Sequence, residues 1–108
     1  MSLLACVVAG NAAAQSVPET DYALQCRGCH GADGSGVAGH VPSLAGVAAL
    51  LETPAGRARL LAVPGVRQSS LSDARLAALL EWAARRFGGP DAPRSGLPLT
   101  AEEVSRLR

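Results

Sequence analysis

Cys26-Arg27-Gly28-Cys29-His30 is the stretch of this chain that decides its fold. Two thiols three positions apart share one helical turn, so each of them can form a thioether with one vinyl group of a haem. The histidine that follows is then held beneath the iron and binds it through an imidazole nitrogen. The pentapeptide therefore predicts one covalently attached haem c, tethered by Cys26 and Cys29, with His30 as the proximal ligand of the haem iron.

Other interpretations of the two cysteines need features that the sequence lacks. A zinc site needs a second pair of ligands, and only Cys6 and His40 remain to supply one. A thioredoxin-like redox pair follows a strand in a βαβ unit, whereas no segment here has a strand pattern. A disulfide between Cys26 and Cys29 would be strained. A non-haem interaction module with zinc or a disulfide at these cysteines stays as an alternative, and the absence of a Soret band would favour it.

Length and composition limit the class of protein. The chain has 108 residues, which suits a single domain. Tyr22, Trp82 and Phe87 are its only aromatic residues, so a buried haem would supply apolar volume that the side chains do not. The formal net charge is +1, from ten Arg, no Lys and nine acidic residues. This balance gives no indication of a nucleic-acid partner.

Residues 1–14 have the pattern of an export leader. The run from Leu3 to Ala9 is apolar, and three alanines precede Gln15 as a small-residue cleavage site, although no basic residue precedes the apolar run. The segment ending at Cys6 also resembles a lipoprotein cleavage box, but the apolar stretch before Cys6 is short. No segment of the mature chain is long enough for a transmembrane helix. We therefore predict export to the periplasm, where bacteria attach c-type haem, with lipid anchoring at Cys6 as an alternative.

Helical spacing, caps and breakers predict an all-helical chain. The clearest helix begins at the N-cap Ser72, and apolar residues recur along it at helical spacing. Four glycines between positions 31 and 39 let the backbone pass close to a flat ligand. The expected elements, in order, are a helix over 18–30, a glycine-rich loop over 31–39, a short Ala/Leu-rich segment ending at Leu51, a helix over 54–62, a polar loop over 65–71, a helix over 72–87 and a short helix opened by the capping box at Thr100.

These features together resemble a class I c-type cytochrome domain over roughly residues 18–88. Pro42-Ser43-Leu44, twelve residues past His30, resembles the proline segment of that family. The resemblance implies that the Pro42 carbonyl accepts the imidazole Nδ1–H of His30, and that Leu44 packs on the haem. It also implies a small all-α domain wrapped around one covalently attached haem, with its first and last core helices crossing near Tyr22.

We expect the cytochrome domain to span residues 15–90. Residues 91–108 are then a C-terminal loop and a short helix, whose brevity suggests truncation.

The resemblance fails at the sixth ligand of the iron. The family usually supplies a Met thioether from the loop before the last helix, and the only methionine here is Met1. The corresponding loop contains Gln68, whose amide oxygen is a weak haem ligand, and water or an empty site is the other option. His40 is disfavoured because it lies two residues before Pro42, which the resemblance places on the His30 side of the haem.

The resemblance implies a non-enzymatic electron carrier. It would pass single electrons between redox partner proteins, such as a periplasmic dehydrogenase or oxidase, which it could serve as an accessory subunit. The alternative is an open-site haem protein that acts as a gas or ligand sensor or as a weak peroxidase. A peroxidase needs a distal base and a cation, and only Arg67 lies near the relevant loop.

Overall fold

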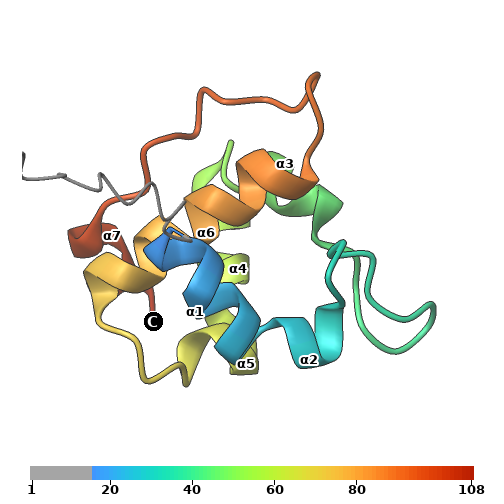
Figure 1. Ribbon diagram of the computed structural model, residues 1–108. Coiled ribbons are helices and arrows are strands. Elements are labelled where there is room, and N and C mark those ends of the chain that lie inside the picture. Colours follow the sequence, from blue (N-terminus) through green and yellow to red (C-terminus); the bar gives the residue numbers. More distant parts are fainter. Residues whose placement is uncertain (1–15) are drawn as a thin grey trace, which may run out of the picture.

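The structure is a computed structural model that describes residues 16–108, so the predicted leader and Cys6 lie outside the described residues. Within this range the chain is helical and has no β-strand (Figure 1). The all-α prediction is therefore confirmed. The elements are α1 (Val17–Gln25), α2 (Arg27–His30), the 3-10 helix η1 (Leu44–Gly46), α3 (Val47–Leu50), α4 (Pro54–Ala62), α5 (Pro64–Arg67), α6 (Asp73–Phe87) and α7 (Ala101–Leu107).

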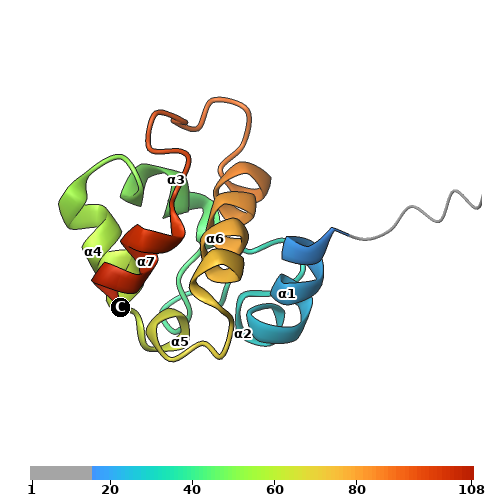
Figure 2. The same cartoon turned by 90° about the vertical axis from the view of Figure 1, so that its left-hand side faces the viewer.

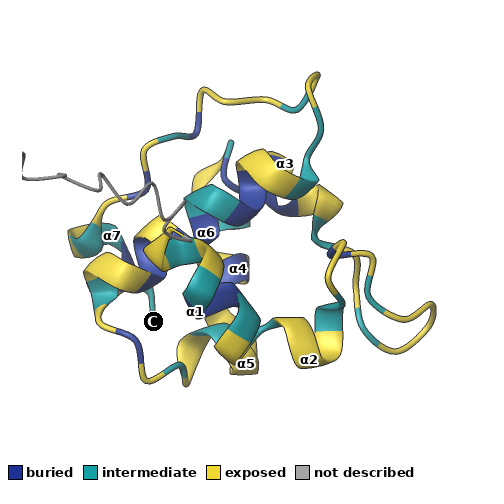
Figure 3. Cartoon of the chain, viewed as in Figure 1, coloured by how far each residue is buried: buried dark blue, intermediate teal, exposed yellow. Residues whose placement is uncertain are grey.

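Helix α6 is the central element of the fold. The Ser72 hydroxyl caps it by accepting a hydrogen bond from the Arg75 N–H, and the helix ends at Gly88, as the sequence predicts. One face carries the buried residues Leu76, Leu79, Leu80 and Ala83. Helices α1, α3 and α7 pack against α6, and α1 crosses it (Figures 1 and 2). The buried parts of α1, α3, α4 and α6 face one another in the interior (Figure 3).

The first predicted helix is wrong in one respect: the chain bends at Cys26. This residue has φ −124° and ψ −36°, so residues 18–30 form α1 and α2 rather than one helix. The Cys26 carbonyl accepts hydrogen bonds from the N–H groups of both Cys29 and His30, at 3.2 and 3.0 Å. The bond to Cys29 spans three residues rather than four, so the first turn of α2 is tighter than an α-helical turn.

The polar loop predicted over 65–71 is also wrong in part, because α5 occupies Pro64–Arg67. The prediction treats Pro64 only as a breaker of the preceding helix. A proline is equally suited to the first turn of a helix, since its fixed φ is helical and its missing N–H has no partner there. The Val63 carbonyl accepts hydrogen bonds from the Val66 and Arg67 N–H groups at 2.9 and 2.8 Å, which closes this short helix.

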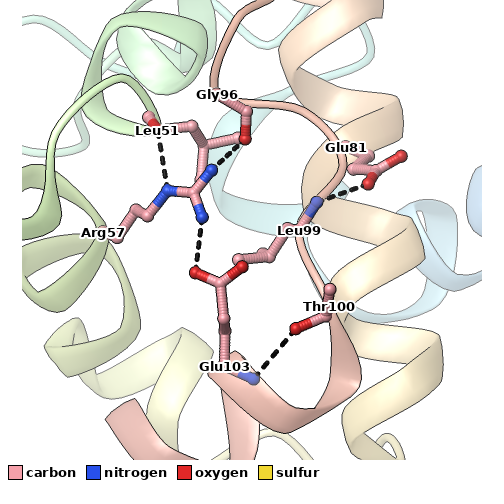
Figure 4. A network of polar contacts seen from close by, with 7 residues as sticks. All are labelled: Leu51, Arg57, Glu81, Gly96, Leu99, Thr100 and Glu103. Carbon is pink, nitrogen blue, oxygen red and sulfur yellow. Dashed lines mark hydrogen bonds and ion pairs between the residues drawn. The ribbon is translucent and has the colours of Figure 1, made fainter.

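The C-terminal segment packs into the same core as the preceding helices. Val104 of α7 has no exposed surface, and α7 lies against α6 and α4 (Figure 2). Arg57 of α4 donates hydrogen bonds to the carbonyls of Leu51 and Gly96 and to the carboxylate of Glu103 (Figure 4). One guanidinium therefore joins α4, the long connection before α7, and α7 itself.

None of the helices within residues 16–108 is both long and apolar enough to cross a membrane.

Candidate haem site

The two cysteines and the histidine of the pentapeptide lie on one turn of chain. Cys26 is half-buried at the bend between α1 and α2, whereas Cys29 is exposed on α2. His30 is partly buried at the end of α2, and Gly31, with φ +82°, then turns the chain away. Cys26 and His30 are thus both partly buried, whereas Cys29 lies at the surface.

The environment of Cys26 keeps its sulfur neutral. Burial, followed by the nearby charges of Asp21 and Cys29, raises the pKa of the Cys26 thiol above its ordinary value. The two cysteines are not joined in a disulfide, and no group of three or more His, Cys, Asp or Glu side chains within residues 16–108 is arranged to hold a metal ion. An uncharged sulfur in a partly apolar setting suits a thioether.

The imidazole of His30 has a fixed partner. Its Nδ1 atom lies 3.0 Å from the backbone carbonyl oxygen of Pro42. A carbonyl can only accept, so this contact assigns the proton to Nδ1 and leaves Nε2 with a free lone pair. A neutral imidazole in this tautomer is prepared to bind a metal through Nε2, as the resemblance implied.

The glycine-rich loop brings Pro42 to His30. The Gly36 N–H donates to the His30 carbonyl at 2.9 Å, and the Leu44 N–H donates to the Gly34 carbonyl at 2.8 Å. Gly36 has φ +69°, and a Cβ there would collide with the Val41 carbonyl. A side chain at position 36 would therefore push the Pro42 segment away from the histidine.

An apolar cavity lies beside the pentapeptide. Its only polar lining side chains within the described part of the chain are those of Tyr22, Cys26 and His30. The other lining residues are Leu44, Val47, Leu60, Val66, Leu79, Leu80 and Ala83. A haem has a flat and largely apolar ring, which can pack against such aliphatic side chains. The donor set, the assigned tautomer and the apolar lining together fit a haem bound through Cys26 and Cys29.

Tyr22 closes one end of this cavity. Its hydroxyl donates a hydrogen bond to the Gly31 carbonyl, and burial raises the pKa of the phenol, so the proton is retained. Its ring lies 5.2 Å from the ring of Trp82 and 5.1 Å from that of Phe87, measured between centroids. These three aromatic residues join α1 to α6 at their crossing, which agrees with the expected place of Tyr22.

The remaining predicted site residues divide into two groups. Leu44 lines the cavity, and its packing on the haem stays a prediction. Gln68 and His40 are exposed, and neither is among the residues that line the cavity. From segment 63–71 the residue that does line it is Val66. The sequence analysis missed Val66 because a valine carries no ligand chemistry and the segment was expected to be an irregular loop.

A family model of cytochrome c matches residues 19–106 of the chain. The chain belongs to the cytochrome c family. It is 32% identical, over an alignment of 126 positions, to a cytochrome c-552 of Thermus thermophilus, with 99% of this chain and 85% of the relative covered. It is 36% identical over 103 residues to another cytochrome c-552 of the same organism, with 78% of this chain and 79% of the relative covered. The comparison with solved structures found no match.

Membership of the cytochrome c family confirms the predicted family, fold and cofactor. The cofactor is haem c, attached through the two cysteines of the pentapeptide, and the protein is an electron carrier rather than an enzyme. The family match extends to residue 106 and includes α7, whose Val104 is buried in the shared core.

Proposed function

We propose that this cytochrome is a periplasmic monohaem electron carrier, with His30 as the proximal iron ligand and Pro42 as its hydrogen-bond acceptor. The observation that carries this proposal is the 3.0 Å contact between His30 Nδ1 and the Pro42 carbonyl. It supplies the imidazole tautomer that can bind iron through Nε2, next to the apolar cavity that Cys26 and His30 both line.

Each residue of the haem site has a separate role in electron transfer. The haem iron supplies a change of one electron between its ferric and ferrous states. Cys26 and Cys29 fix the haem against rotation, His30 holds the iron on one side, and Leu44 packs against the ring. Apolar walls that exclude water reduce the reorganisation that accompanies a change of iron charge.

The exposure of Cys29 favours an electron path at the surface. Cys29 is exposed while Cys26 is half-buried, so the tethered edge of the haem would lie close to solvent. A partner protein could approach this edge without a change in the fold. We propose periplasmic redox partners such as a dehydrogenase or an oxidase, and the export pattern of residues 1–14 supports this compartment.

The peroxidase alternative has little support from the cavity. Proton transfer to bound peroxide needs a base such as histidine or glutamate, together with a cation that stabilises the departing charge. Among the described residues that line the cavity, His30 is the only such base and no cation is present. Arg67, the cation nearest in sequence to Val66, is exposed.

The test is to replace His30 in protein matured with the haem-attachment machinery. His30→Ala should retain covalent haem and lose the normal spectrum and the one-electron reduction wave of the wild type in voltammetry. His40→Ala is the matched control, because it removes the exposed histidine, and should leave both unchanged. An unaltered spectrum in His30→Ala would exclude His30 as the proximal ligand, and wild-type protein without a Soret band would exclude the haem site itself.

A further inference from the structure

The cavity beside His30 holds no second ligand for iron among the described residues. Three of its lining side chains carry a polar atom, and each already has a role. Cys26 forms a thioether, His30 is the proposed proximal ligand, and the Tyr22 hydroxyl donates a hydrogen bond to the Gly31 carbonyl. Every other described residue that lines the cavity is aliphatic.

Helix α5 explains why the polar residues nearby do not enter the cavity. Consecutive residues of a helix point about 100° apart, so one inward residue leaves its next two neighbours facing elsewhere. Val66 is partly buried against the hydrophobic core, whereas Arg67 and Gln68 are exposed. Hydrogen bonds from the Val66 N–H to the Val63 carbonyl, and from the Ser69 N–H to the Val66 carbonyl, fix this orientation at 2.9 and 3.2 Å.

We propose that Val66 faces the sixth coordination position, which the protein leaves open to a neutral diatomic gas such as carbon monoxide or nitric oxide. This inference rests on the proposed role of His30 as the proximal ligand. It replaces Gln68 and His40 as candidate sixth ligands, because both side chains are exposed and neither lines the cavity.

The apolar lining of the cavity favours neutral ligands over anions. An anion such as azide would leave water for a wall that offers it neither a cation nor a free hydrogen-bond donor, so only its attraction to the ferric iron would offset the desolvation cost. A neutral diatomic molecule has no such cost. We therefore expect carbon monoxide to bind ferrous protein readily, and azide to bind ferric protein weakly.

The first part of the test uses holoprotein with carbon monoxide and azide as probes. We expect a high-spin spectrum in the ferric and ferrous states, a shift of the Soret band on addition of carbon monoxide, and little change with azide. A low-spin spectrum that carbon monoxide does not alter would overturn the inference and leave the electron-carrier proposal intact. Azide binding comparable with that of exposed haem would also overturn it. Failure of haem attachment would instead overturn the proposed function.

The second part introduces a ligand at the proposed position. Val66→Met should convert the spectrum to low-spin and lower the affinity for carbon monoxide at least about tenfold, because the gas must displace a thioether. Arg67→Met is the matched control: it adds the same side chain one residue further on, where it faces solvent, and should change neither property. Equal effects of the two variants, or no effect of Val66→Met in protein that carries haem, would show that Val66 does not face the sixth position.

Discussion

His30 Nδ1 and the Pro42 carbonyl oxygen are 3.0 Å apart, although the two residues are twelve positions apart in the sequence. The acceptor belongs to the main chain, so the contact does not depend on the proline ring itself. Proline contributes a fixed φ, which sets the direction of the backbone at this point. The loop between the two residues therefore determines the orientation of the imidazole.

Pro42→Ala should preserve the histidine contact, because alanine retains the carbonyl. We expect an unchanged visible spectrum and a loss of less than about 1 kcal/mol in the free energy of unfolding, caused by the greater freedom of the unfolded chain. Spectra and a denaturant titration of the holoprotein would measure both. A changed iron spectrum would show that the ring, rather than the carbonyl, positions His30.

Gly36→Ala and Gly39→Ala separate backbone strain from collision. Both glycines have left-handed φ values, +69° and +77°, so either alanine costs about 1 kcal/mol. Only at Gly36 would the new methyl group meet the Val41 and Pro42 carbonyls, and we expect a total loss of about 3 kcal/mol there. Gly36→Ala should also alter the haem spectrum, since the Pro42 segment moves. Similar unfolding curves for the two variants would contradict this explanation.

Arg75→Ala should leave the carboxylate of Asp21 buried and without its ion-pair partner. Asp21 is 2% exposed and receives two hydrogen bonds from the Arg75 guanidinium, which joins α1 to α6. We expect a loss of about 2 kcal/mol in denaturant unfolding. Arg85→Ala is the control, because the contact of Arg85 with Glu81 is 3.9 Å long and should contribute less than about 0.5 kcal/mol. Equal losses of unfolding free energy in the two variants would show that the Asp21–Arg75 ion pair contributes no more than the Glu81–Arg85 contact.

Glu103→Gln should make the protein less sensitive to acid. The hydrogen bond from Arg57 holds the pKa of the Glu103 carboxyl below its ordinary value. A carboxyl with a lowered folded-state pKa stabilises the fold above the unfolded pKa of about 4.3, and this stabilisation is lost as pH falls through the folded value. Glu103→Gln should therefore cost about 1 kcal/mol at pH 7 and progressively less at lower pH. Unfolding titrations between pH 7 and pH 3 would measure this, with the exposed Glu102→Gln as control. A cost that does not change with pH would contradict it.

Prediction from the sequence succeeded best for features that depend on residues with one well-defined structural role. The pentapeptide around Cys26 indicated haem c, and Ser72 located the start of the longest helix to within one residue. The Pro42 contact was expected from family resemblance and is present as a hydrogen bond. These features depend on local chemistry, which the order of residues along the chain expresses directly.

The sequence failed where three-dimensional packing decides. Pro64 can end one helix or begin another, and only the contacts of α5 show that it does both. Gln68 was the side chain favoured as sixth ligand because it has a donor atom, whereas the residue of this segment that lines the cavity is Val66 of α5. A search of the sequence for iron-binding side chains could not find Val66, because the side chain of valine has no atom that binds a metal.

The crossing of α1 and α6 also gives this cytochrome an optical reporter. Trp82 is its only tryptophan, and its ring packs against Tyr22, which lines the haem cavity. Energy transfer from the indole to a haem this close would quench tryptophan emission in the folded holoprotein. Emission should therefore increase when the helices separate, even though the haem stays covalently attached. Fluorescence of the unmodified protein would then follow opening of the cavity without any added label.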